Sequence, residues 1–574
     1  MDKSMLGKAW VADAGDHSRT ADGDIVTGVL SARGMTDPAA IQEFLNPSIH
    51  DQMPDPFVLK DIERAVGIVA DAIAAGEKIA VFGDYDVDGI TSTAIMLKYL
   101  RAVGADPLWH LPNREGEGYG LNPDAIRDLH TKGARVLITV DCGISAAAEI
   151  ALAKELGIKV IVTDHHSPDA TLPNADAVVN PKRSDDESGL TYLAGVGVAF
   201  MFLVALNRAL RAAHLSDHDI NLIEYMDLVS LGTICDMMPL VNLNRAFVAT
   251  GLRVLETRQN LGLRTLMDVA GVRKPSTYSV GFVLGPRLNA AGRLDSANPA
   301  LDLLLTDNPL IARDLAEKLH KMNAERLAIQ NAIMLDAAEL AEKCAKSGKC
   351  SLFLCGENWH GGIMGIVAGR LKDQFCMPAC VATKSDGIIN GSGRSVPGVD
   401  MGRIIHEALA AGILTEGGGH AAAAGFTLPE EKENEFCEFL ESAVAAQLGD
   451  GTVSQQVVVD AEIDAGSANM RLVREMEKLA PFGQGNPEPT IVVTGGVLVW
   501  AGVMGRGTHL RGNLRTSAGT QLPFVGFNMA GTPVGEFLLD EANFERKIIL
   551  CGKLKENEYQ GRVSAQFVVE DIAV

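Results

Sequence analysis

The stretch Lys78–Gly89, KIAVFGDYDVDG, decides the fold that we expect for this chain. A short apolar run is followed by a glycine and then by aspartates at the alternate positions Asp84, Asp86 and Asp88. The next residues, Thr91–Val103, have the pattern of a helix. Strand, acidic loop and helix in this order are typical of one unit of a parallel α/β sheet.

The same order recurs twice further along the chain. Ala134–Val140 (ARVLITV) precedes Asp141 and a helix-like segment, and Lys159–Thr163 (KVIVT) precedes the triplet DHH at 164–166. Continuous apolar strands that alternate with helices predict a parallel sheet covered on both faces. Right-handed crossovers bring the carboxyl ends of such strands to one edge, where ligands bind. We therefore expect the three polar clusters to meet in one cleft.

Length and composition predict a folded protein of several domains. A chain of 574 residues suggests about three or four domains. The segment Met1–Trp10 lacks the apolar stretch of a secretory signal, and the longest apolar run, Leu193–Leu206, is shorter than a membrane span and is expected to be a buried core helix. The nine cysteines contain no CxxC pair and are interpreted as reduced thiols. We expect a cytoplasmic protein without membrane contact.

The net charge of -22 argues against indiscriminate binding to nucleic acid, because phosphate affinity depends on lysine and arginine. The objection weakens if the acidic residues surround metal ions and the basic residues line one groove.

A long helix is expected to join two domains. Residues Leu315–Leu340 contain no glycine or proline, and Arg326 lies on their apolar stripe. The stripe comprises Leu315, Leu319, Met322, Ile329, Ile333 and Leu340. A second α/β region begins with Ser351–Leu354 and Pro378–Thr383.

The final part of the chain is expected to be an all-β barrel, since short alternating strands such as Lys547–Lys553 and Val563–Glu570 are separated by turn residues. The predicted domains are an N-terminal segment 1–60, a first α/β domain 61–275, a connector with the long helix 276–345, a second α/β domain 346–447 and the barrel 453–574.

The first acidic cluster favours a metal site. Three carboxylates in one loop repel one another unless cations or strong hydrogen bonds neutralise them. A solvated turn and a calcium loop are the alternatives, but a strand precedes the cluster and the late glutamate of an EF-hand loop is absent. Asp141 and the DHH triplet add oxygen and imidazole donors, a mixture that suits Mn²⁺ and tolerates Mg²⁺. Taken alone, the two histidines are more often polar loop residues.

Four motifs resemble those of the DHH phosphoesterase superfamily. They are GDYDVDG, VDCG, TDHH and GTICDMMPL, the last at Gly232–Leu240 with Asp236. By this resemblance, two divalent cations, Mn²⁺ or Mg²⁺, would be held by Asp84, Asp86, Asp88, Asp141, His165 and Asp236. The resemblance places His166 near the phosphate and implies a catalytic set of Asp86, Asp88, Asp141, His165, His166 and Asp236.

Within the superfamily, five further segments look like those of the RecJ exonucleases. They are Leu111–Leu121, Gly285–Leu294, Asn358–Leu371, Glu416–Phe426 and Leu479–Pro489. The resemblance covers nearly the whole chain and implies a DHH domain, a DHH-associated domain and an oligonucleotide-binding (OB) barrel. It further implies hydrolysis of single-stranded DNA from the 5′ end to mononucleotides, in recombination and repair. The chain departs at Phe82, where some relatives have a histidine, which removes one possible ligand of the second cation.

The resemblance also implies residues that bind substrate. Ser392, Arg394 and Ser395 can donate hydrogen bonds to phosphates, although GSGRS alone also fits a glycine turn. Arg114 and Tyr119 are candidates for holding the terminal nucleotide, with a flexible exposed loop as the alternative.

Arg293 and His420 lie in family motifs, but alone they would be interpreted as a surface arginine and a helix-packed histidine. Gly418 and Gly419 would let backbone amides approach a phosphate, and the alanines that follow are expected to begin a helix.

Single-stranded DNA is the expected partner, and a single-strand-binding protein and a helicase are candidate protein partners of a monomer. The barrel offers few aromatic residues for base stacking, namely Trp500, Phe524 and Phe527 in its middle part. Two rival functions differ from this one. The first is a DHH enzyme of short oligoribonucleotides, cyclic dinucleotides or pyrophosphate, and the second is a nonenzymatic scaffold at replication forks.

Overall fold

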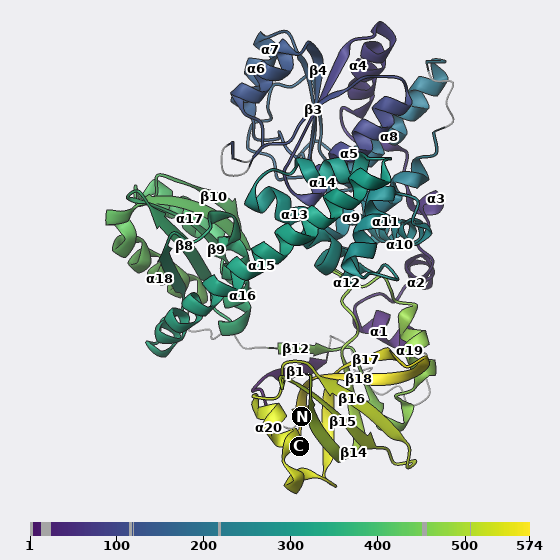
Figure 1. Ribbon diagram of the computed structural model, residues 1–574, viewed down its shortest axis with the longest axis vertical. Helices are drawn as coiled ribbons and strands as arrows, with labels where there is room; N and C mark the ends of the chain where they lie inside the picture. Colours follow the sequence, from purple (N-terminus) through teal and green to yellow (C-terminus); the bar gives the residue numbers. More distant parts are fainter. Residues whose placement is uncertain are drawn as a thin grey trace. The chain divides into compact units, whose positions relative to one another are not determined.

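The computed structural model describes residues 4–12, 25–113, 117–118, 120–215, 220–449, 456–505 and 507–574. The chain divides into two compact units (Figure 1). The catalytic-motif unit contains Ile49–Pro239 and Leu243–Val453, and the barrel unit contains Met1–Ser48, Leu240–Asn242 and Ser454–Val574.

The first sheet of the catalytic-motif unit has five strands, all parallel, in the order β3-β2-β4-β5-β6. This arrangement confirms the predicted parallel α/β fold. The strands β2, β4 and β5, each of which precedes a polar cluster, are direct neighbours. The bounds are β2 (Lys78–Gly83), β3 (Leu108–His110), β4 (Ala134–Val140), β5 (Lys159–Thr163) and β6 (Ala177–Val179).

Helices cover both faces of this sheet, as Figure 1 shows. On one face α6 (Pro123–Thr131) and α7 (Ala147–Glu155) share a core with Phe82. On the other face lie α4 (Ile62–Ala75), α5 (Val87–Ala102) and α8 (Gly195–Ala212), and α9 (Met226–Cys235) packs on α5 and α8. Phe82 is completely buried and packs on the ring of His110, so a hydrophobic side chain suits this position.

Two helices differ in length from the sequence expectation. Helix α5 begins at Val87 instead of Thr91, because Asp86 accepts hydrogen bonds from the amides of Asp88 and Gly89 and caps the helix. Helix α8 is long and apolar enough to cross a membrane, but 67% of it is buried inside the protein. It is the core helix that the apolar run predicted.

The connector consists of helices that pack against the long helix α15 (Pro309–Lys346). Helix α15 extends beyond both predicted ends. Leu319, Met322, Arg326 and Ile333 of the predicted stripe are buried, and Leu340 near its end is 39% exposed. The other elements of the predicted connector 276–345 are α12 (Thr277–Ser279), the π-helix η3 (Val280–Leu284), α13 (Gly285–Leu294) and α14 (Asn298–Leu305). The helices α10 (Asn242–Thr257) and α11 (Leu261–Ala270) precede them, within the predicted first α/β domain.

The second α/β domain has a mixed sheet in the order β10-β11-β9-β8-β7, in which only the pair of β7 and β8 is parallel. Its elements are β7 (Leu352–Glu357), α16 (Met364–Phe375), β8 (Ala379–Ser385), β9 (Ile388–Arg394), α17 (Met401–Ala410), β10 (Glu416–His420), β11 (Ala423–Pro429) and α18 (Glu433–Leu448).

The alanines after Gly419 do not begin a helix, so this expectation was wrong. They turn into strand β11, which pairs antiparallel with β10. The side chains of Ala424, Phe426 and Leu428 alternate toward the core, and their burial stabilises a strand over a helix.

The barrel unit contains a closed barrel of the strands β14, β15, β16, β18 and β17, because β17 pairs back with β14. This confirms the predicted OB-like barrel. Strands β17 and β18 are longer than the sequence pattern indicated. The bounds are β13 (Ala461–Asp464), α19 (Met470–Glu477), β14 (Ile491–Met504), β15 (His509–Arg515), β16 (Gln521–Gly526), α20 (Pro533–Leu539), β17 (Lys547–Tyr559) and β18 (Arg562–Ala573).

The N-terminal part of the chain completes the barrel unit, which the sequence did not predict. Strand β1 (Ala9–Ala12) pairs in parallel with β12 (Gln456–Val459). Helix α1 (Ile25–Ala32) buries Val29 and Leu30 in the same hydrophobic core as the barrel strands. Helices α2 (Pro38–Leu45) and α3 (Ile49–Gln52) follow it in the chain.

We expect Leu30→Ala to destabilise the barrel unit by about 2–5 kcal/mol, since it leaves a cavity where a fully packed side chain had been. Val503→Ala is the control, because Val503 is half exposed on the same barrel and should change stability by about 0.5 kcal/mol or less. Urea unfolding followed by tryptophan fluorescence measures both, with Trp10 and Trp500 as probes in this unit. Equal stabilities of the two variants would show that α1 is not part of the core.

Candidate metal centre

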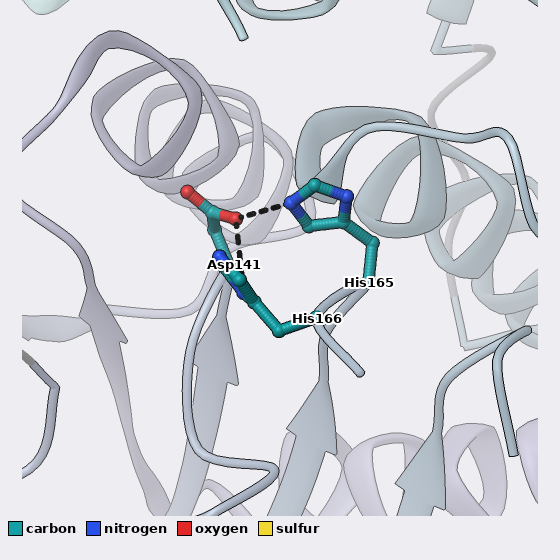
Figure 2. Close-up of side chains that lie close together, drawn as sticks. All are labelled: Asp141, His165 and His166. Carbon is teal, nitrogen blue, oxygen red and sulfur yellow. Dashed lines mark ion pairs between the residues drawn. The ribbon is translucent and has the colours of Figure 1, made fainter. Parts of the chain in front are cut away.

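The polar clusters at the ends of β4 and β5 meet directly (Figure 2). Nε2 of His165 lies 3.1 Å from Oδ1 of Asp141, and Nδ1 of His166 lies 3.9 Å from the same oxygen. Asp141 has a left-handed backbone, φ 61°, which turns the chain sharply after the strand.

The other candidate ligands join this group. Nε2 of His165 lies 3.5 Å from Oδ2 of Asp236 and 3.8 Å from Oδ2 of Asp88. One carboxylate oxygen each from Asp84, Asp86 and Asp141 form a second group, in which all three oxygens lie within 4.8 Å of one another. The structure thus brings all the sequence-predicted ligands into one continuous cluster.

Backbone amides hold Asp88 in place. Its Oδ2 accepts a hydrogen bond of 2.7 Å from the amide of Gly195, and its Oδ1 accepts one of 2.9 Å from the amide of Val196. These amides belong to the first turn of α8, where the helix dipole favours negative charge.

Three glycines make the close approach of the acids possible. A Cβ atom at Gly195 would lie 2.6 Å from Oδ1 of Asp141, and one at Gly232 would lie 2.8 Å from Oδ1 of Asp88. A Cβ at Gly89 would lie 2.5 Å from the backbone nitrogen of Asp84. Sequence reasoning assigned no role to Gly195 or Gly232, because only the folded chain brings them to the acids.

The electrostatics of the cluster fit a bound cation. Burial, together with the charges of neighbouring carboxylates, raises the pKa of Asp88 to about 7 and that of Asp236 to about 9. Burial, with the charges of the other aspartates, also holds the pKa of Asp141 well above its usual range. The group therefore cannot carry its full negative charge near neutral pH without positive charge beside it.

Two buried atoms that could act as metal ligands also support a bound cation. Nε2 of His165 and Oδ2 of Asp236 have no hydrogen-bond partner among the described residues, despite their short separation. Burial lowers the pKa of His165 to about 3, so its ring is neutral and can donate a lone pair. Neutral imidazole and carboxylate oxygens are suitable ligands for Mn²⁺ and Mg²⁺, and the residues present fit such an ion.

Asp164 positions His166 instead of joining the cluster. It is fully buried, and its Oδ1 lies 2.8 Å from Nδ1 of His166, while its Oδ2 accepts from the amide of Ile144. Burial alone would raise the pKa of Asp164, but the hydrogen bond and charge of His166 outweigh it and lower the pKa. Burial alone would lower the pKa of His166, but Asp164 and the nearby aspartates raise it to about 9. The surrounding aspartates thus favour the protonated form of His166.

A cavity of about 430 Å³ adjoins His166 and is lined from both α/β domains of the unit. The predicted substrate residues Gly419 and His420 of β10 line it together with His166. Its other lining residues are Gly120, Leu121, Gly143, Ile144, Ser145, Ala146, Glu149, Asp164, Ser167, Asp169 and His406. His406 was not predicted, since a single histidine on an amphipathic helix carries no distinctive signal.

The remaining predicted substrate residues that the structure describes lie outside the lining of this cavity. Nη1 of Arg293 donates to the carbonyl of Gly362 at 3.1 Å, and Nη1 of Arg394 donates to the carbonyl of Gly393 at 2.8 Å. Oγ of Ser395 donates to the carbonyl of Val399. Ser392 and Gly418 are half-buried in β9 and β10, and Arg114 and Tyr119 lie outside the described residues.

In the barrel unit, one of the three predicted stacking residues is unsuitable. Phe524 is buried in the barrel core and cannot contact a base. Trp500 and Phe527 are partly exposed, at 37% and 54%. The guanidinium of Arg511 lies 6.0 Å from the centre of the Trp500 ring. The two side chains therefore form a cation–π pair on the barrel.

Comparison with known proteins agrees with this architecture. Three family models match: the DHH family N-terminal domain at 78–233, the DHHA1 domain at 347–446 and the RecJ OB domain at 459–571. The single-stranded-DNA-specific exonuclease RecJ of Salmonella typhimurium is 37% identical over 530 residues, which are 90% of each chain. The chain belongs to the RecJ family. As a RecJ protein it is an enzyme, an exonuclease of the DHH superfamily.

Solved RecJ structures share the fold. RecJ of Thermus thermophilus in complex with Mn²⁺ has a TM-score of 0.79 and 30% identity, and the match covers 96% of this chain and 75% of that one. The same protein in complex with Mg²⁺ has a TM-score of 0.74 and 28% identity over the same shares. These relatives bind the two cations that the ligand chemistry of the cluster favours.

We expect Gly195→Ala to weaken Mn²⁺ binding by about 10- to 100-fold, because the added methyl group displaces the Asp141 carboxylate. Gly197→Ala is the matched control on the same helix, since its new Cβ would meet atoms no closer than 3.4 Å. Calorimetric titration with Mn²⁺ measures both. Unchanged affinity in Gly195→Ala would show that Asp141 does not hold the ion.

Proposed function

We propose that this RecJ protein hydrolyses phosphodiester bonds of single-stranded DNA from the 5′ end and releases mononucleotides. The cofactor is Mn²⁺ or Mg²⁺, and the proposed ligands of two ions are Asp84, Asp86, Asp88, Asp141, His165 and Asp236. The main support is the continuous cluster of buried carboxylates around His165, because phosphodiester hydrolysis by paired cations needs such a set of donors.

When bound, the cations supply the activation of a water molecule and neutralise charge on the scissile phosphate. The protein's own residues orient the reactants. The amides of α8 hold Asp88, and Asp164 holds the ring of His166. A protonated imidazole has a second N–H, and we propose that His166 donates it to a phosphate oxygen of the substrate.

The cavity beside His166 supports removal of single nucleotides. Its volume of about 430 Å³ lies in the range of pockets for small ligands. His420 and Gly419 close it from the second α/β domain, where they can contact the departing nucleotide. We propose that Arg293, Ser392, Arg394, Ser395 and Gly418 contact the strand outside the cavity. As the sequence resemblance implies, we propose that Arg114 and Tyr119 hold the terminal nucleotide.

Other parts of the proposal follow from the likeness to the RecJ family. They are the 5′ polarity, a role in recombination and repair, a cytoplasmic monomer, and association with a single-strand-binding protein and a helicase. We propose the same domain boundaries as before, with the DHH catalytic domain at 61–275 and the DHH-associated domain at 346–447.

An assay with end-labelled oligonucleotides tests the activity and the polarity. With Mn²⁺ we expect 5′-labelled single-stranded DNA to release labelled mononucleotide from the first time point, while 3′-labelled DNA shortens progressively. Duplex DNA and RNA are the comparison substrates. Hydrolysis of dinucleotides without action on longer DNA would support the small-substrate rival. Bound metal without any turnover would support the scaffold.

We expect Asp141→Ala and His165→Ala to abolish turnover with an intact fold, because each removes a ligand and not a core side chain. Asp124→Ala is the control, since Asp124 is an exposed acid on α6. Saturating Mn²⁺, at about 100 times its Kd, should stabilise the wild type by about 2.7 kcal/mol. Thermal unfolding with and without Mn²⁺ measures this effect. If either ligand variant keeps both activity and stabilisation, that residue is not a ligand.

A further inference from the structure

A stripe of polar side chains is buried along the long helix α15, outside the metal centre. Asn323, Arg326 and Gln330 are only 5%, 8% and 0% exposed. Their spacing of three and four residues places them on one face of the helix. Helix α15 packs against both α13 and α16, which lie beside it in Figure 1. Apolar residues would be expected at such a position.

The stripe is incompletely satisfied within the protein. Nε of Arg326 and Oδ1 of Asn323 are buried and have no hydrogen-bond partner in the described part of the chain. No ion pair with a carboxylate is found for Arg326 among those residues either. A buried charge without a partner is unfavourable, so Arg326 lowers the free energy of unfolding of the protein.

Two further arginines flank Arg326 on the neighbouring helices. On α13, Nε of Arg287 donates to Nδ1 of His320 at 3.3 Å and Nη1 donates to the carbonyl of Val283. On α16, the guanidinium of Arg370 donates to the side-chain oxygen of Gln330 at 2.7–3.0 Å, in the amide orientation that satisfies both groups. Neither pairs with a carboxylate in the described ranges.

The guanidinium groups of Arg287 and Arg370 are close enough to Arg326 for their charges to act on it. Burial lowers the pKa of Arg326, and the positive charges of Arg370 and Arg287 lower it further. The three residues, which we call the arginine cluster, therefore form a region of concentrated positive charge in a chain whose net charge is -22. Repulsion of this kind is relieved by an anion.

We propose that the arginine cluster binds a phosphate group of the DNA strand, separate from the phosphate at the metal centre. This inference rests on the proposed function. The guanidinium fork matches the geometry of phosphate oxygens, and the unpartnered Nε of Arg326 provides a buried donor. The phosphate is an internal one, because the arginines do not line the cavity that would hold the terminal nucleotide.

The helices that carry the cluster also contact the candidate site. On α13, Oδ1 of Asn289 accepts from the amide of Val87 at 3.2 Å, and a Cβ at Gly292 would lie 2.7 Å from the carbonyl of Tyr85. On α16, a Cβ at Gly365 would lie 2.7 Å from Nη2 of Arg394. The helices of the cluster therefore adjoin the acidic loop of the metal centre and the predicted substrate residue Arg394.

The test uses Arg287→Gln and Arg326→Met, with Arg313→Gln as the matched control. Arg313 lies on the same helix α15, is exposed and forms an ion pair with Glu317. Binding of a 30-nucleotide single strand is measured in EDTA at several salt concentrations. We expect each cluster variant to bind about tenfold more weakly. The slope of log affinity against log salt should fall by about 0.7, the loss of one phosphate contact.

Hydrolysis of a dinucleotide with Mn²⁺ should stay at the wild-type rate in both variants, since so short a substrate does not reach the cluster. Without DNA, Arg326→Met should unfold at or above the wild-type temperature, because it removes an unpaired buried charge. If Arg326→Met fails to fold, Arg287→Gln carries the test.

Three results would overturn the inference. In the first, the cluster variants bind the single strand with the same affinity and the same salt dependence as the control Arg313→Gln. The second is a matching loss on the dinucleotide, which would place the cluster at the reacting nucleotide. In the third, inorganic phosphate raises the unfolding temperature of the wild type but not of the cluster variants, while all of them bind the strand equally well. Free phosphate would then be the ligand of the cluster. A wild type that binds the strand but does not degrade it would contradict the proposed function instead, because binding is measured without metal.

Discussion

The architecture around the candidate site depends on one constraint, the mutual repulsion of carboxylates that are crowded away from water. Asp88, Asp141 and Asp236 lie around a single imidazole, that of His165, and burial raises the pKa of each acid. Amides at the start of α8 offset part of this cost for Asp88. A divalent cation would offset the larger remainder, so metal binding and local stability are coupled here.

The order of the first sheet could be predicted because its strands have an unusually clear signal. Apolar runs such as ARVLITV end abruptly in charged residues, and the topology of parallel sheets allows few arrangements of such units. The helix expected after Gly419 was wrong because of tertiary packing. Ala424 alternates toward a core and joins a strand. Local composition contains no information on that environment.

The ligand candidates could be found from sequence because each occupies a distinctive motif at a strand or helix end. The glycines that let these ligands approach one another could not be found from the sequence. Gly195 and Gly232 are separated from the acids they accommodate by long stretches of chain, and only the folded structure shows that a methyl group would not fit. The positioning role of Asp164 on His166 was likewise invisible, because a triplet such as DHH does not reveal which member ligates and which orients.

The assignment of α1 and β1 to the barrel unit has a consequence for synthesis on the ribosome. Their partners, β12 to β18, begin about 400 residues later in the chain. At usual elongation rates the ribosome needs roughly 20–80 s to synthesise that length, and during this time the apolar face of α1 has no packing partner. The catalytic-motif unit is synthesised during that interval. The barrel unit can close only when its last strand, β18, has emerged.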